Sequence, residues 1–245
     1  MNHLKSKTFI VILIVTNILT AGFFILGKKE TKVPGIVLAG TEQQSKPGYP
    51  YMDNPQYIEK MSLYTVYGKK GKIVMLGNSI TERVEWTELL NRSDVINRGI
   101  GSDITEGFLS RMNYIYSVDP KVCYIMGGVN DIARNISQET TVQNLKSIIE
   151  ALKQHKIIPV LQSVLFVTDT YANNKVMNQK IESLNTELVK MAKENNVTFL
   201  DINTVLSSGN QLIKEYALSD GIHLTGAGYD KWRTLLLADL KKHKL

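Results

Sequence analysis

The chain has 245 residues, 43% of them hydrophobic and 21% charged, which favours one folded domain with a substantial core. Its net charge is +6, but the lysines are scattered apart from a cluster at residues 241–244. No basic stripe alternates with aromatic residues, so the composition argues against a nucleic-acid partner.

The first element in chain order is an apolar segment at residues 8–26, with lysines on both sides. Its length is just sufficient to span a bilayer as a helix. Residues 1–27 are therefore predicted to be a signal peptide, cleaved after Gly22, or a retained membrane anchor. Both alternatives stay open, and both predict an exported, extracytoplasmic protein that contacts the membrane through this segment.

Residues 28–53 are predicted to be a linker because prolines and glycines are concentrated there. Asn54 and Pro55 then form a typical helix start, with a capping side chain before a proline at the first helical position. This helix is predicted to run to Tyr67 and to pack against the rest of a domain at residues 54–245.

Short apolar runs alternate with longer amphipathic runs over the remaining chain. The short runs predict strands at residues 72–76, 94–97, 122–126, 157–163 and 197–202. The long runs predict helices at residues 81–90, 105–117, 140–154, 176–195 and 226–242. This alternation is typical of an α/β fold whose parallel sheet is covered on both faces, with sites at the carboxyl ends of the strands.

The single cysteine, Cys123, lies inside the apolar strand predicted at residues 122–126. One thiol forms no internal disulfide, and a cysteine in such a strand is usually a small buried hydrophobic residue. A nucleophilic role is therefore not expected for it.

A serine follows the first predicted strand in the sequence Gly77-Asn78-Ser79-Ile80-Thr81. At the start of a helix its hydroxyl would lie near unpaired N–H groups that favour a developing anion. A serine in this position is more often a simple helix cap, so the pentapeptide alone is weak evidence for a nucleophile.

The segment Asp220-Gly221-Ile222-His223 supplies an imidazole and a carboxylate close together. A serine nucleophile needs a base, and the other three histidines lie in the leader, at a helix end and in the tail. His223 is therefore the candidate base, with Asp220 as the group that would orient it. Taken alone, these residues are more typical of an Asp that caps a turn and a His that begins the last helix.

An oxyanion formed at an ester carbonyl needs preorganised hydrogen-bond donors. The Asn130 side chain, the Ser79 N–H and the backbone of residues 99–103 are candidates. Asn130 and Asp131 also fit a simple turn or helix cap.

Four blocks of the sequence together resemble the SGNH hydrolases, or GDSL-type esterases. The blocks are Gly77-Asn78-Ser79, Gly99-Ile100-Gly101-Ser102-Asp103, Gly128-Val129-Asn130-Asp131 and Asp220-Gly221-Ile222-His223. The chain looks most similar to the acetylhydrolase branch, with platelet-activating-factor acetylhydrolase-like proteins and carbohydrate O-acetylesterases. The resemblance implies a flavodoxin-like three-layer α/β/α sandwich with a central parallel sheet of about five strands, and no metal or organic cofactor.

The same resemblance assigns roles to individual residues. Ser79, His223 and Asp220 are expected to be nucleophile, base and orienting acid, with Ser79, Ser102 and Asn130 at the oxyanion hole. Many family members have Asp at position 78 and Gly at position 102. The side chain of Ser102 narrows that part of the site and disfavours some backbone conformations.

Further residues are predicted to contact substrate, namely Asn78, Gly101 and Tyr171, with Phe166 and Trp86 as additional pocket candidates. Core packing is the favoured role for Trp86. Other active-site classes do not fit, since Thr81 replaces the last glycine of Gly-x-Ser-x-Gly and Ile104 replaces the last glycine of a dinucleotide motif. No cluster with metal-ligand spacing competes.

The sequence therefore predicts an exported serine esterase that removes short acyl groups, most readily acetyl, from a sugar or glycan. The alternatives are a lysophospholipase or phospholipid acyl hydrolase, a glycan O-acyltransferase and a non-catalytic glycan-binding module. The small-acyl preference is expected from the branch of the family and from the absence of a long apolar lid. The oligomeric state is left open.

Overall fold

The computed structural model describes residues 51–245, which belong to one compact unit. The predicted signal peptide or anchor at residues 1–27, and all but the last three residues of the predicted linker at 28–53, lie outside the described residues. Within residues 51–245, no helix is both long and apolar enough to cross a bilayer.

A five-stranded parallel sheet forms the middle layer, in the order β2-β1-β3-β4-β5. The strands are β1 (Ile73–Gly77), β2 (Val95–Gly99), β3 (Val122–Met126), β4 (Ile158–Gln162) and β5 (Thr198–Leu200). Every residue of β1 and β3 is buried, as expected for strands covered on both faces. From β1 the chain adds β2 on one side of the sheet and then β3, β4 and β5 on the other, so the direction of strand addition reverses between β1 and β3. Parallel sheets bind ligands at the carboxyl ends of the strands at such a point.

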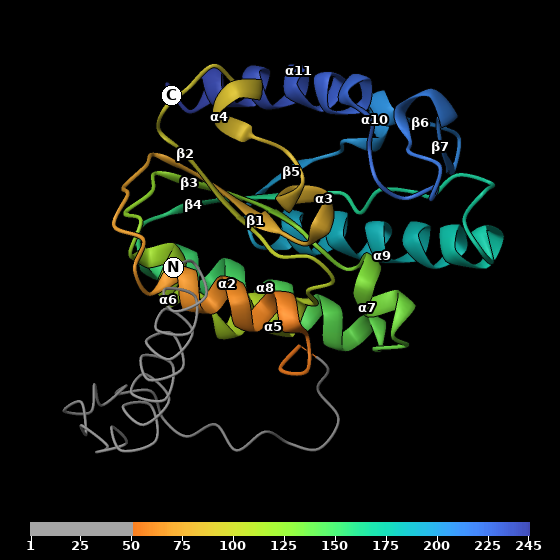
Figure 1. Cartoon of the computed structure of the whole chain (residues 1–245). Helices are drawn as coiled ribbons and strands as arrows, with labels where there is room; N and C mark the ends of the chain where they lie inside the picture. Colours follow the sequence, from red (N-terminus) through yellow and green to blue (C-terminus); the bar gives the residue numbers. More distant parts are fainter. Residues whose placement is uncertain (1–50) are drawn as a thin grey trace, which may run out of the picture. The chain divides into compact units, whose positions relative to one another are not determined.

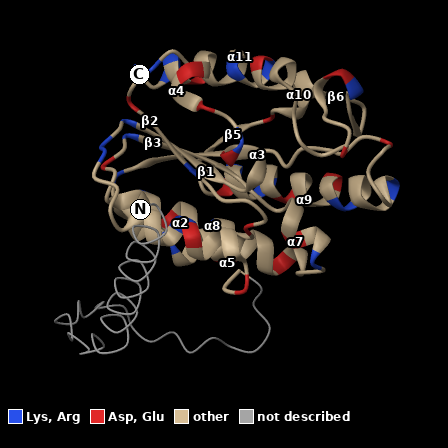
Figure 2. Cartoon of the chain, viewed as in Figure 1, with Lys and Arg blue, Asp and Glu red and all other residues tan. Residues whose placement is uncertain are grey.

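Helices cover both faces of the sheet, which confirms the predicted three-layer α/β/α architecture (Figure 1). One face carries α4 (Trp86–Leu89), α10 (Asn203–Leu206) and α11 (Gly226–Lys242). The other carries α2 (Pro55–Tyr64), α5 (Thr105–Ser110), α6 (Asn113–Tyr116), α8 (Gln138–Gln154) and α9 (Asn174–Glu194). Short helices α3 (Ser79–Glu82) and α7 (Val129–Ala133) follow β1 and β3 directly. Residues of both charges are distributed over the helices and loops (Figure 2).

Two of the predicted helices are each divided into two. The helix predicted at residues 81–90 is α3 and α4, because the Trp86 indole donates a hydrogen bond to the Thr81 carbonyl (2.8 Å) and so replaces a helical partner. The helix predicted at residues 105–117 is α5 and α6, and it breaks at Arg111, whose side chain turns into the core. The helix predicted to end at Tyr67 ends at Tyr64. An unpredicted antiparallel pair, β6 (Ser207–Ser208) and β7 (Gln211–Leu212), and a 3₁₀ turn, η1 (Lys214–Tyr216), precede α11.

An aromatic cluster joins α11 to the segment after β1. The rings of Trp86 and Trp232 meet edge to face with centroids 5.0 Å apart, and Tyr229 stacks beside Trp232 at 6.2 Å. The Tyr229 hydroxyl donates to the Ile80 carbonyl (2.7 Å) in α3. The last helix is therefore bonded directly to the short helix that begins with Ser79.

Candidate active site

Ser79 is the first residue of α3, at the carboxyl end of β1. The close turn requires glycine at position 77, because a Cβ there would lie 2.0 Å from Thr81 Oγ1. The Asn78 side chain caps the helix by accepting a hydrogen bond from the Ile80 N–H (3.0 Å). Within residues 51–245 the Ser79 N–H has no hydrogen-bond partner, as is usual at a helix start.

Asn78 does not face the solvent side of the site. Its side chain is almost fully buried, with 1% exposure, and its amide oxygen is occupied by the helix cap. This placement argues against the predicted substrate contact and assigns Asn78 to orienting the turn that carries Ser79.

Two side chains from one distant loop meet beside Ser79. His223 Nε2 lies 2.8 Å from Ser79 Oγ, and His223 Nδ1 lies 2.7 Å from Asp220 Oδ2. The other Asp220 oxygen accepts hydrogen bonds from the backbone N–H groups of Ile222 (3.1 Å) and His223 (3.0 Å). The carboxylate is therefore held by its own loop while it holds the imidazole.

The pKa of Asp220 reflects these contacts. Partial burial raises its pKa, but the hydrogen bonds from the His223 ring and from the two backbone N–H groups outweigh that effect and lower it to about 2. Asp220 is thus ionised across the whole range in which an esterase is assayed, so it accepts a hydrogen bond from the imidazole N–H without taking the proton.

This pKa predicts a pH dependence of stability. An unfolded Asp titrates near ~3.9, above the folded value, so Asp220 stabilises the folded state above about pH 4 and loses that contribution as the pH falls towards 2. Asp220→Asn is expected to lower the unfolding free energy at pH 7, and this deficit should shrink to less than about half near pH 2.5. Urea unfolding at both pH values measures this. An equal deficit at the two pH values would contradict it.

The second and third blocks lie next to Ser79 at the ends of β2 and β3. The Ile100 N–H donates to the Gly77 carbonyl (3.1 Å), which ties the loop after β2 to the end of β1. Asn130, in α7, donates one amide hydrogen to the Asp103 carbonyl (2.8 Å) and keeps the second available. The Ser102 N–H has no partner among the described residues, and Ser102 has a left-handed backbone with φ of 58°.

Gly101 lies on the side of this loop that packs against α2. Its carbonyl accepts a hydrogen bond from Asn54 Nδ2 (2.8 Å), and a Cβ at Gly101 would meet Gln56 Oε1 at 2.0 Å. This placement argues against the predicted contact between Gly101 and substrate. It shows instead why no side chain fits between the loop and the helix.

Tyr171 lies beside the loop that carries His223. A Cβ at Gly221 would be 2.9 Å from the Tyr171 nitrogen, and the Thr168 N–H donates to the Gly221 carbonyl (2.8 Å). Tyr171 is half-buried against the core, so its contact with substrate stays a prediction.

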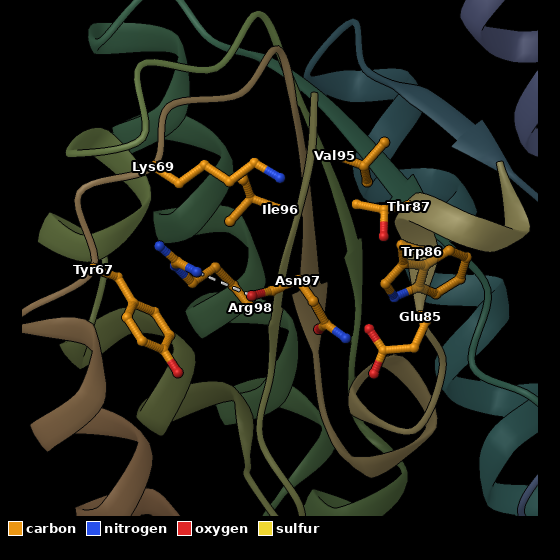
Figure 3. A pocket seen from close by; sticks show the side chains of 9 residues that line it. All are labelled: Tyr67, Lys69, Glu85, Trp86, Thr87, Val95, Ile96, Asn97 and Arg98. Carbon is orange, nitrogen blue, oxygen red and sulfur yellow. Dashed lines mark hydrogen bonds between the residues drawn. The ribbon is translucent and has the colours of Figure 1, made fainter. Parts of the chain in front are cut away.

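Two cavities are separate from this cluster of residues. The first, of about 390 Å³, lies against β2 and is lined by Tyr67, Lys69, Glu85, Trp86, Thr87, Val95, Ile96, Asn97 and Arg98 (Figure 3). The second, of about 430 Å³, includes Phe166. Neither is lined by Ser79 or His223, so the predicted pocket roles of Trp86 and Phe166 are not supported, and both side chains are buried.

A buried ion pair that was not predicted from the sequence lies beneath the site. Arg111 bonds Asp103 through Nε (3.0 Å) and Nη2 (2.9 Å), and both side chains are fully buried. Arg111 also donates to the carbonyls of Gly77 (3.1 Å) and Arg98 (2.8 Å), at the ends of β1 and β2. Burial raises the pKa of Asp103 to about 6, although Arg111 opposes this shift. No local pattern identifies Arg111, since its partners are eight or more residues away.

The third block contains a second buried carboxylate. Asp131 accepts hydrogen bonds from the Thr105 N–H (3.2 Å) and hydroxyl (2.5 Å), which fixes the start of α5. Burial raises the pKa of Asp131, although the bonds from Thr105 lower it. Among residues 51–245 no group of three or more His, Cys, Asp or Glu side chains is arranged to hold a metal ion.

Comparison with known proteins identifies the family to which the chain belongs. Residues 75–231 match the GDSL-like Lipase/Acylhydrolase family, so the chain belongs to that family and is a carboxylic ester hydrolase. It is 28% identical over 173 residues to the platelet-activating factor acetylhydrolase IB subunit alpha2 of Rattus norvegicus, covering 66% of this chain and 73% of that protein.

Solved structures share the fold. A GDSL-like lipase from Bacteroides thetaiotaomicron superposes with a TM-score of 0.67 and 28% identity, covering 76% of this chain and 98% of that chain. A catalytic mutant of an acetylxylan esterase from Geobacillus stearothermophilus gives a TM-score of 0.60 at 17% identity, covering 71% of this chain and 95% of that chain.

Proposed function

We propose that this protein hydrolyses short acyl esters, chiefly acetyl esters on a sugar or glycan, through a covalent acyl-enzyme on Ser79. The observation that carries the proposal is the continuous chain of contacts from Ser79 Oγ to His223 (2.8 Å) and from His223 to Asp220 (2.7 Å). These distances are within proton-transfer reach, with the base held by a third group.

In the proposed first half-reaction, His223 Nε2 accepts the Ser79 proton while Oγ attacks the ester carbonyl. The tetrahedral oxyanion accepts hydrogen bonds from the N–H groups of Ser79 and Ser102 and from the Asn130 amide. The imidazolium then gives its proton to the leaving alcohol as the ester bond breaks, and the acyl group stays on Ser79. General-base catalysis of this kind contributes about 10²–10⁴-fold in rate.

In the second half-reaction, water takes the place of the alcohol. His223 accepts a proton from the water, the resulting hydroxide adds to the acyl carbonyl, and collapse of the intermediate releases the carboxylic acid and restores the Ser79 hydroxyl. A sugar hydroxyl in place of water would make the same enzyme an O-acyltransferase.

The short-acyl part of the proposal rests on two relatives, one named an acetylhydrolase and the other an acetylxylan esterase. A phospholipid or lysophospholipid substrate is the second candidate, and the apolar segment at residues 8–26 favours it by keeping the enzyme near a membrane. Export is part of the proposal, with residues 1–27 either retained as a membrane anchor or cleaved, and fractionation of cells that express the full chain tests both alternatives.

Ester chain length separates the candidates. We expect kcat/KM for p-nitrophenyl acetate to exceed that for the butyrate by about tenfold or more, because each extra methylene must fit a site built for acetyl. Hydrolysis of the p-nitrophenyl series measures this, and a preference for octanoate or longer would favour the lipid candidate. Transfer of labelled acetyl to an added glycan, instead of release as acetate, would favour the acyltransferase.

A further inference from the structure

Ser102 has a backbone conformation that serine rarely adopts without support. Its φ of 58° lies in the left-handed region, where a Cβ crowds the backbone and glycine is normally found. Such a conformation persists only when its surroundings over-determine it. The donor proposed for the oxyanion hole therefore depends on whatever holds this residue in place.

Two side chains hold the peptide units on either side of Ser102. Asn54 Nδ2 donates to the Gly101 carbonyl (2.8 Å), and Arg134 Nη1 donates to the Ser102 carbonyl (2.6 Å). Because a peptide unit is planar and trans, its N–H points opposite to its C=O. Fixing the Gly101 carbonyl against Asn54 thus fixes the Ser102 N–H in the opposite direction, away from α2.

The Asn54 side chain is itself rigidly placed. It is 8% exposed, and its oxygen accepts a hydrogen bond from the Gln56 N–H (3.1 Å) as the cap of α2. The helix is anchored on the loop next to Gly101, because Tyr57 and Tyr64 pack on the fully buried Ile100. This helix precedes the matched family region at residues 75–231.

We propose that Asn54 and Arg134 are positioning residues that together replace glycine at position 102 of the oxyanion loop. Asn54 orients the N–H donor from outside the matched family region, and Arg134, four residues after Asn130, holds the next peptide unit. The inference rests on the proposed esterase function and assigns the N-terminal helix α2 a part in transition-state stabilisation.

The test is Asn54→Asp, because aspartate is as good a helix cap as asparagine but has no hydrogen to donate to Gly101. We expect kcat on p-nitrophenyl acetate to fall about 10- to 100-fold with KM within about twofold of the unsubstituted enzyme. Asn54→Ser, which caps but does not reach Gly101, should behave alike. The labelling rate of Ser79 by a fluorophosphonate should fall in parallel, since its phosphoryl oxygen needs the same donors.

Tyr57→Phe is the matched control. It removes the hydrogen bond between the Tyr57 and Ser110 hydroxyls (2.5 Å), which also anchors α2, but leaves the bond from Asn54 to Gly101 intact. This variant should keep kcat within about twofold, because loosening α2 elsewhere does not turn the Ser102 peptide.

A double-mutant cycle with Ser102→Gly separates positioning from general stability. Glycine adopts the left-handed conformation without strain, so the loss caused by Asn54→Asp should shrink to about threefold or less in the Ser102→Gly background. An equal loss in both backgrounds, or no loss from Asn54→Asp, would overturn the inference. Failure of the unsubstituted protein to hydrolyse any ester or to be labelled at Ser79 would instead refute the proposed function, and the inference with it.

Discussion

Replacing Ser79 by alanine is expected to lower kcat for p-nitrophenyl acetate by about 10⁴–10⁶-fold, because no other group in the cluster can form the acyl-enzyme. Within residues 51–245 the Ser79 hydroxyl bonds only to His223, and the side chain is partly exposed, so the free energy of unfolding should change by less than about 1 kcal/mol. Steady-state kinetics and urea unfolding measure the two quantities on the same preparation.

Ser207→Ala is a suitable control for this experiment. Like the Ser79 hydroxyl, the Ser207 hydroxyl bonds a side chain, since it donates to Asn203 Oδ1 (3.0 Å). Ser207 lies in β6, outside the cluster of Ser79, His223 and Asp220. The Ser207→Ala variant should retain full activity, and a fluorophosphonate should label this variant at Ser79. Persistent turnover in Ser79→Ala would remove this serine from the mechanism. If Ser79→Ala does not fold, Ser79→Cys takes its place, and formation of an acyl-enzyme on the cysteine is measured.

Arg111→Ala is expected to lower the free energy of unfolding by about 3–5 kcal/mol, the largest stability effect that we predict. The substitution leaves Asp103 buried without its cation and removes the guanidinium donor from the carbonyls of Gly77 and Arg98. Both carbonyls end strands next to the site, so activity should fall together with stability. Denaturant unfolding followed by circular dichroism measures the effect.

The control is Arg92→Ala, which removes another arginine with two hydrogen bonds to one aspartate. Arg92 bonds Asp94 at 2.9 and 2.8 Å, but both side chains are about one-quarter exposed. Because water solvates the remaining carboxylate, this variant should lose no more than about 1 kcal/mol. Similar losses from the two variants would show that burial does not distinguish the two ion pairs.

Local sequence patterns were sufficient to predict the sheet and the helix layers. The central strands β1 and β3 are apolar runs, and β2, β4 and β5 each contain a shorter apolar run; such runs are a property of the strand itself. The meeting of Ser79 with Asp220 and His223 was also predictable. The chemistry needs those residue types, and the carboxyl ends of parallel strands share one edge.

The remaining features depend on contacts between distant residues. Arg111 breaks a predicted helix because it pairs with Asp103 and with strand carbonyls, and Trp86 breaks another because its indole bonds Thr81. The role of the buried Asn78 side chain as the cap of α3 could have been anticipated, since asparagine before a helix is a common cap. The bond from Asn54 to Gly101 spans 47 residues and has no sequence signature.

The aromatic cluster has a practical consequence, since the chain's two tryptophans, Trp86 and Trp232, both belong to it. Intrinsic fluorescence therefore reports the junction between the serine-bearing turn and the C-terminal helix that follows the histidine loop. If this junction opens before the sheet melts, the emission maximum will move to longer wavelength while far-ultraviolet ellipticity is retained. Enzymatic inactivation on heating should then follow the optical signal, so a dye-free measurement would reveal when the catalytic parts separate.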